Sequence, residues 1–188
     1  MTQDLIFSKM DLRKLIVPLI IEQILAVTVG MADVMMVSSA GEAAVSGVSL
    51  VDMINVLLIN IFAALATGGA VVSSQFLGAK DRSKACNAAG QLLFISFILS
   101  MLITIIVLFS KSPLLRLLFG KIENDVMQAS LTYLTISALS YPFIAVYNSC
   151  AALFRSMGNS KVSMYTSAGM NVINIAGNAV FVFGFHMG

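Results

Sequence analysis

The sequence predicts an all-α membrane protein, a polytopic bundle of five transmembrane helices. Four stretches of at least 24 residues contain no Asp, Glu, Lys, Arg or His: 53–79, 85–110, 126–154 and 162–185. A fifth apolar stretch, from Leu15 to about Val37, is interrupted only by Glu22 and Asp33. About 20 apolar residues of helix cross the hydrocarbon core of a bilayer. Backbone polar groups in lipid must bond within their own segment, so the spans are expected to be helical.

The composition excludes several classes of function. The chain has 188 residues, of which 59% are hydrophobic and 11% are charged. A soluble domain carries roughly twice that charged fraction. The net charge of +2 implies no nucleic-acid partner, and two cysteines are too few for a disulfide framework or a zinc site. With no Gly-rich phosphate loop, His/Cys metal pattern or nucleophile elbow, we expect neither an enzyme nor a cofactor.

The first helix is expected over about 12–37, with Pro18 near its start, where a missing N–H costs least. Residues 38–50, which include two glycines, are expected to form a connection. The second helix should cover about 52–77. Small residues recur in it at four-residue spacing, as in Ala66 with Ala70, which favours close packing of helices in lipid.

A charged loop at 80–84 should lead to a third helix over about 86–109. Ser112-Pro113 is typical of an N-cap and first-turn pair, and 114–119 is too short to span a bilayer. A short helix in the membrane interface is therefore expected there.

A fourth helix is expected over about 126–153, with a kink at Pro142, and a fifth over about 162–184. With the amino terminus in the cytoplasm, eight basic residues lie inside and three outside, which satisfies the positive-inside rule. The predicted location is the inner or plasma membrane of the cell, with a cytoplasmic amino terminus. The inner set is Lys9, Arg13, Lys14, Lys80, Arg82, Lys84, Arg155 and Lys161, and the outer set is Lys111, Arg116 and Lys121.

Two acids lie within the first helix. Asp33 is about 28 Å of helix axis beyond Lys14, in the outer half of the membrane. Ionisable residues at such depths usually face a bundle interior or water, so Asp33 is predicted to bind a proton or a cation. Glu22 precedes it by 11 residues, which leaves about 20° of offset, so the two acids share one helix face.

A stripe of polar residues marks the fifth helix: Ser167, Asn171, Asn174 and Asn178. Their offsets place them on one narrow face, which should point inward because unpaired amides in hydrocarbon are costly. Asn178 lies about 26 Å beyond Lys161, close to the predicted depth of Asp33. A carboxylate and amides at the same depth in the membrane are suited to bind H⁺ or Na⁺. Apart from Na⁺ at Asp33, no metal is expected. Candidate cavity residues are Glu22, Ser167, Gln75, Tyr141 and Asn148.

In their order and spacing, four motifs resemble those of the multidrug and toxic compound extrusion (MATE) family of cation-coupled efflux transporters. Pro18 is followed by Asp33 in the first helix. Residues 75–81, Gln-Phe-Leu-Gly-Ala-Lys-Asp, are similar to the family's Q-x-x-G-A-x-D. Residues 155–161 resemble its R-x-x-G-[DN]-x-K loop, and Asn174 to Asn178 resembles its N-x-x-x-[DN].

The resemblance implies that residues 1–188 are the first five helices of an amino-terminal six-helix lobe. It further implies two lobes, alternating access and a coupling-ion site at Asp33, Asn174 and Asn178. The polar stripe adds Asn171 to the predicted coupling-ion site. Many members carry Asp where this chain has Asn178, which leaves the choice between H⁺ and Na⁺ open. The expected partners are a drug or organic cation, the lipid bilayer and the second lobe, because the chain resembles a fragment.

The expected function is therefore secondary active antiport, in which drugs or organic cations leave the cell in exchange for H⁺ or Na⁺. Two alternatives stay open. One is a lipid-linked saccharide flippase of the same superfamily, although such proteins often carry basic residues in the central cavity. The other is a non-transporting membrane scaffold subunit, in which Asp33 and the asparagines only hold helices together.

Overall fold

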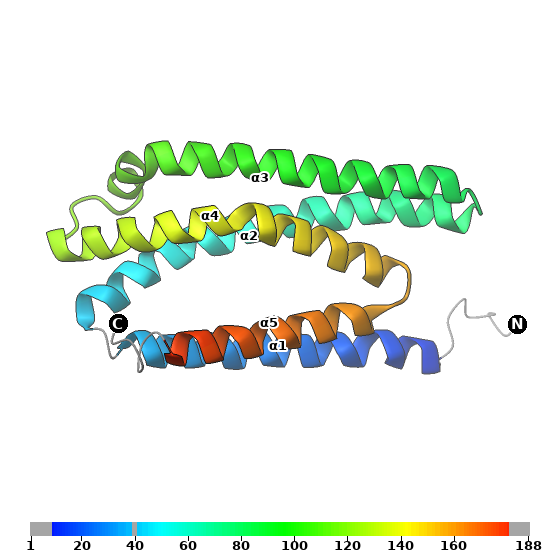
Figure 1. Cartoon of the computed structure of the whole chain (residues 1–188), viewed down its shortest axis with the longest axis horizontal. Helices are drawn as coiled ribbons and strands as arrows, with labels where there is room; N and C mark the ends of the chain where they lie inside the picture. The colour runs from blue at the N-terminus through cyan, green and yellow to red at the C-terminus, as the bar shows by residue number, and fades with distance from the viewer. Residues whose placement is uncertain (1–8, 39–40, 181–188) are drawn as a thin grey trace, which may run out of the picture. The chain divides into compact units, whose positions relative to one another are not determined.

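Five α-helices make up the computed structural model, which describes residues 9–38 and 41–180 (Figure 1). They are α1 (Lys9–Ser38), α2 (Glu42–Gly78), α3 (Arg82–Phe119), α4 (Asn124–Ser156) and α5 (Ser160–Ala179). The described residues contain no strand, so the predicted all-α class is confirmed. The chain divides into two compact units. One combines α1 with α5 and the end of α4, and the other contains α2, α3 and α4 up to Leu153.

Four of the five described helices, α1 to α4, are long and apolar enough to cross a membrane. The prediction of five spans therefore exceeds this number by one, at α5. The described part of α5 ends at Ala179, whereas the predicted helix continued to 184, outside the described residues. Within Ser160–Ala179, serine, threonine and three asparagines lower the hydropathy.

The predicted connection over 38–50 is wrong, because α2 already begins at Glu42. Its two glycines have different roles. Gly41 precedes the helix with φ 106°, in the region that favours glycine. Gly47 lies inside α2, where an added Cβ would be 2.8 Å from Ala129 Cβ and 3.0 Å from Ser130 N. The second glycine thus permits close packing of α2 against α4.

The charged segment at 80–84 is mostly helical, because α3 begins at Arg82 instead of 86. Lys80 turns the chain with φ 62°, and the Asp81 carboxylate accepts a hydrogen bond from Lys84 N at 3.1 Å. Lys84 Nζ also lies 3.0 Å from Asp81 Oδ2. The backbone hydrogen bond from Lys84, followed by the one from its side chain, lowers the pKa of Asp81. Asp81 is therefore the N-cap of α3.

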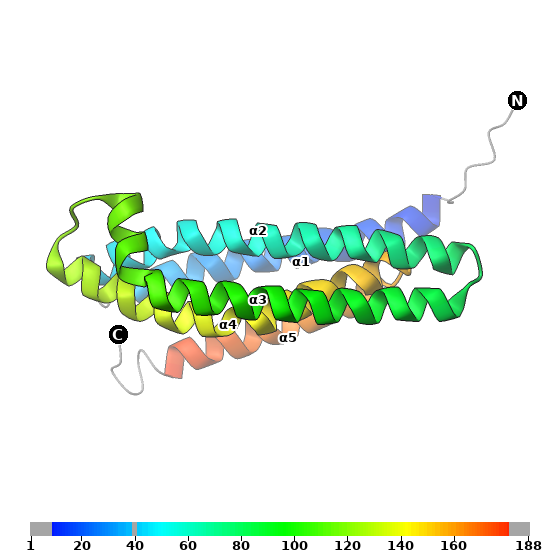
Figure 2. The ribbon, with the colours of Figure 1, turned by 90° about the horizontal axis from the view of Figure 1, so that it is seen from above.

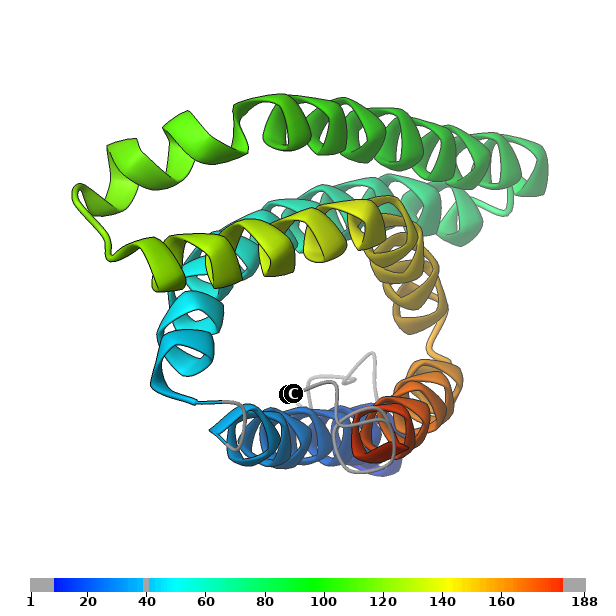
Figure 3. The same cartoon turned by 60° about the vertical axis from the view of Figure 1, so that its left-hand side comes forward.

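The short interfacial helix predicted over 114–119 is also wrong, because α3 continues through Pro113 to Phe119. Its last turns bend away from the rest of the helix (Figures 2 and 3). Pro113 accounts for the bend, since proline removes one helical hydrogen bond and crowds the preceding turn. Leu115 in this segment is fully buried against the unit's core, so the turns pack on protein.

The α2–α4 unit has a core of buried apolar side chains from all three helices. Phe62 and Tyr141 pack with ring centroids 6.1 Å apart. The other members are Val51, Ile54, Val107, Leu115, Leu134, Ala138 and Ala145. Pro142 lies inside α4, whose ribbon bends along its length (Figure 1).

Of the small residues in α2, only some lie against another helix. Ala66 and Ala70 are buried in a second cluster with Leu92. An added Cβ at Gly69 would collide with the Leu92 side chain, whereas Gly68 has nothing within 4 Å. One face of this stretch therefore packs closely, as expected for helices in lipid.

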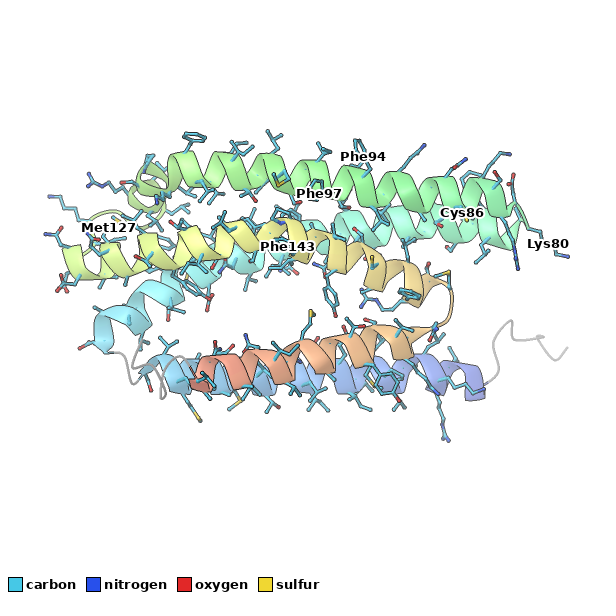
Figure 4. The ribbon with its side chains drawn as sticks, in the orientation of Figure 1. Lys80, Cys86, Phe94, Phe97, Met127 and Phe143 are labelled. Atoms are coloured by element: carbon cyan, nitrogen blue, oxygen red, sulfur yellow. The ribbon has the colours of Figure 1, made fainter. Side chains whose placement is uncertain are left out.

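Large apolar side chains project outward from every described helix. In the α2–α4 unit, Phe94, Phe97 and Phe143 are exposed by 67%, 44% and 77% (Figure 4). Such a surface in water would favour aggregation, but it matches a hydrocarbon solvent. The exposure of these side chains agrees with an integral membrane protein.

Candidate functional site: two acids between α1 and α5

The first acid, Asp33, is bonded to the polar stripe of α5. Asn178 Nδ2 donates to Asp33 Oδ1 at 2.8 Å and to Asn174 Oδ1 at 3.2 Å. Helices α1 and α5 lie side by side in the three ribbon views, so the bond links neighbouring helices (Figures 1, 2 and 3). Asp33 and Asn178 are half-buried, and Asn174 is exposed. The structure therefore brings three of the predicted coupling-site residues together.

Asn171, the fourth predicted residue, lies elsewhere on the same stripe. Its Nδ2 is enclosed and has no hydrogen-bond acceptor among the described residues. Ser167, one turn earlier, is buried at 8% exposure. Of the predicted stripe, Ser167 is therefore buried, Asn171 and Asn178 are half-buried and Asn174 is exposed. Its ion-binding role stays a prediction.

The donor set at Asp33 suits a hard monovalent cation or a proton. The side chains supply carboxylate and amide oxygens, which are the ligands that hard cations prefer. In this arrangement Asn178 turns its NH₂ group toward the carboxylate, which compensates negative charge. A cation between the two groups would require the amide to rotate so that its Oδ1 faces the ion. No group of three or more His, Cys, Asp or Glu side chains suited to a metal occurs among the described residues.

The second acid, Glu22, lies in a three-residue cluster of the same unit. Ser163 Oγ lies 3.0 Å and 3.2 Å from the two carboxylate oxygens of Glu22. Arg155 Nη1 donates to Ser163 Oγ at 3.2 Å and lies 3.7 Å from Glu22 Oε1. The exposed fraction of the Glu22 side chain is 18%, and that of Arg155 is 33%. The charges of this cluster are therefore paired and largely shielded.

A third polar cluster belongs to the α2–α4 unit and contains the predicted cavity residue Tyr141. Tyr141 Oη donates to Asn55 Oδ1 at 2.8 Å. Tyr133 Oη donates to Asp52 Oδ1 at 3.1 Å, and Asn55 Nδ2 lies 3.4 Å from the same oxygen. These bonds join α2 to α4 over more than 80 residues of chain.

The remaining predicted cavity residues are not joined to these clusters by any recorded side-chain bond. Asn148 Nδ2 is enclosed without an acceptor among the described residues. Gln75 is exposed near the carboxyl end of α2. Their cavity role stays a prediction.

Sequence reasoning missed Ser163, Arg155 and Asp52 as members of polar clusters. Ser163 precedes Ser167 by four residues, so extending the stripe one turn backward would have included it. Arg155 was assigned to a loop, but it lies in the last turn of α4. Asp52 was placed at the start of the second helix, and the earlier start at Glu42 puts it inside α2.

Comparison with known proteins agrees with the motifs. The MatE family model matches residues 18–180. The "Uncharacterized transporter YisQ" of Bacillus subtilis is 33% identical over 167 residues, which cover 89% of this chain and 36% of that protein. The "Multidrug export protein MepA" of Staphylococcus saprophyticus is 25% identical over 172 residues, which cover 91% of this chain and 38% of that protein. The "Probable multidrug resistance protein NorM" of Thermotoga maritima is 24% identical over 177 residues, which cover 93% of this chain and 37% of that protein.

Solved structures share the fold. A MATE protein in complex with MaL6 has a TM-score of 0.89 at 22% identity, covering 95% of this chain and 39% of that chain. A MOP superfamily transporter from Pyrococcus furiosus has a TM-score of 0.86 at 23% identity, and the match covers 93% of this chain and 38% of that chain. The chain thus spans 36–38% of the length of the three relatives named above. Both the resemblance and the fold class predicted from sequence are confirmed.

Proposed function

The chain belongs to the MatE family, and from that premise we propose that it forms part of a secondary transporter. In this proposal it exports drugs or organic cations in exchange for H⁺ or Na⁺, and it performs no enzymatic reaction. The names of MepA and NorM relatives support drug export over a saccharide flippase. The single observation that carries the proposal is the hydrogen bond between Asn178 and the Asp33 carboxylate.

The mechanism follows from the charge at Asp33. Protonation of this carboxylate, or binding of Na⁺, changes the local charge by one unit. The hydrogen bond from the Asn178 amide then weakens, because the carboxylate is no longer charged. A protonated carboxyl donates to the amide oxygen, and a bound cation is coordinated by it. Since this bond joins α1 to α5, loading and release of the ion alter the packing of these helices. Such a change is able to bias a transporter between two arrangements.

The rest of the proposal concerns the setting of the site. The loop charges support a cytoplasmic amino terminus in a cell membrane. This chain covers 39% of the length of related transporter structures. That share supports a second lobe as its partner, with the substrate passing between the two lobes. We leave open which ion is exchanged, because Asn178 adds an oxygen ligand for Na⁺ without adding a second acid.

The test is Asp33→Asn in the complete transporter that carries this sequence, reconstituted in vesicles with ethidium as the cationic probe. We expect ion-driven ethidium efflux to fall to the level of empty vesicles, because the amide neither binds a proton nor carries charge. Membrane insertion should be unchanged.

The matched control is Asp52→Asn, the same substitution at an acid of the α2–α4 unit, which should keep most of the efflux. Imposing a pH gradient and a Na⁺ gradient separately identifies the ion. Normal efflux by Asp33→Asn under both gradients contradicts the proposal.

A further inference from the structure

Glu22 and Asp33 share one face of α1 and are roughly 17 Å apart along its axis. Each acid is bonded to α5, but at a different end of the same stripe. Ser163 binds Glu22, and Asn178 binds Asp33. One helix pair thus holds two acids at two depths, joined by a row of polar side chains.

The Glu22 carboxylate lies beside one hydroxyl donor and one cation. The Ser163 hydroxyl has one hydrogen, which it donates to the carboxylate, while its oxygen accepts from Arg155. Arg155 is the charged group recorded within ion-pair distance of Glu22, and it balances the carboxylate's charge. Lys161 and Tyr165, on the same helix as Ser163, are exposed. A proton that reaches Glu22 therefore enters a shielded cluster of one carboxylate, one hydroxyl and one cation.

The stripe between the two acids contains groups that require a partner. Asn171 Nδ2 is enclosed and has no acceptor among the described residues. Ser160 Oγ, on a residue 2% exposed, is likewise unpartnered among them, but it lies beyond Ser163, at the amino-terminal end of α5. Enclosed donors of this kind are normally satisfied by ordered water. Ser167 adds a buried hydroxyl between them. With ordered water at these groups, the hydroxyls along α5 would complete a row of hydrogen-bonding groups between the two acids.

We propose that Glu22 is a second proton-carrying residue, which takes the proton released at Asp33 and passes it to cytoplasmic water. In the first transfer the Asp33 carboxyl becomes a carboxylate and the Glu22 carboxylate becomes a neutral carboxyl. In the second, Glu22 gives the proton to water and its ion pair with Arg155 re-forms. This inference rests on the proposed function, and it commits the exchanged ion to H⁺.

The experiment uses the complete transporter in vesicles, with ethidium as the exported probe and a trapped pH-sensitive dye to report proton flux. Glu22→Gln should slow coupled ethidium efflux and proton flux at least about tenfold while ethidium binding is retained. Glu22→Asp should restore part of the flux. Gln23→Ala, at the same depth and exposed, should behave as the unmodified protein.

A purely structural role of the cluster is distinguished by Arg155→Gln. This change breaks the ion pair but keeps the acid, so a proton carrier should retain most of its proton flux in Arg155→Gln and lose it in Glu22→Gln. Equal loss of flux in Glu22→Gln and Arg155→Gln overturns the inference. A normal rate and pH profile in Glu22→Gln, or efflux driven by Na⁺ without proton flux, also overturns it. Those outcomes leave the proposed function standing, since that function fails only if Asp33→Asn transports normally.

Discussion

At Asp33 the hydrogen bond from Asn178 decides how the carboxylate is held. The match between these residues could be predicted from sequence, because helical rise converts distance from Lys14 and from Lys161 into depth. The same arithmetic could not place Ser163 beside Glu22, because it puts Glu22 about 12 Å beyond Lys14 and Ser163 only about 3 Å beyond Lys161. Contacts at Arg155 depend on the end of α4, which sequence patterns locate only within a few residues.

Tyr141 offers a separate prediction at the scale of one atom. Tyr141→Phe removes the donor to Asn55 Oδ1 and leaves that buried oxygen without its 2.8 Å partner. We expect a loss of about 1 kcal/mol in the free energy of unfolding, the usual size for hydrogen bonds between helices in membranes. Unfolding in mixed detergent micelles measures it. Tyr165→Phe, the same change at a 68% exposed residue, should be neutral, and an equal loss in both would refute the prediction.

At the scale of helices, the sequence predicted where helices run but not where they begin and end. Charge-free runs identified α2 and α3, because lipid excludes charge over about 20 residues. Their ends were misplaced since glycine and proline were interpreted as breaks in the helix. Gly47 instead provides room for Ala129, and Pro113 bends α3 without ending it. Whether a glycine or proline ends a helix or lies within it depends on packing partners that are distant in the chain.

The two glycines of α2 test this explanation. Gly47→Ala forces a Cβ to within 2.8 Å of Ala129 Cβ, so α2 and α4 must separate, and we expect the protein to lose about 1–3 kcal/mol of stability. Gly68→Ala meets nothing within 4 Å and should be neutral or slightly stabilising, because alanine favours helix. Thermal unfolding in detergent compares the two. Similar stability in both variants would show that Gly47 does not set the approach of these helices.

For the whole molecule, function depends on which end of each helix faces the cytoplasm. Lys80, in the α2–α3 turn, and Met127, near the start of α4, lie at opposite ends of the α2–α4 unit (Figure 4). If that unit crosses the membrane, these ends are on opposite sides. The excess of basic residues assigns the Lys80 end to the cytoplasm. Proton release from Glu22 toward the cytoplasm requires this same orientation.

Cysteine labelling tests that orientation. In a protein lacking Cys86 and Cys150, Lys121→Cys should react with a membrane-impermeant thiol reagent in intact cells, because Lys121 is exposed in the α3–α4 connection. Lys80→Cys, also exposed, should react only after the cells are permeabilised. Asn159→Cys, between α4 and α5, should follow Lys80→Cys, because two spans separate Lys80 and Asn159. The reverse pattern would place Glu22 on the outer side, and its proposed exchange with the cytoplasm would then be impossible.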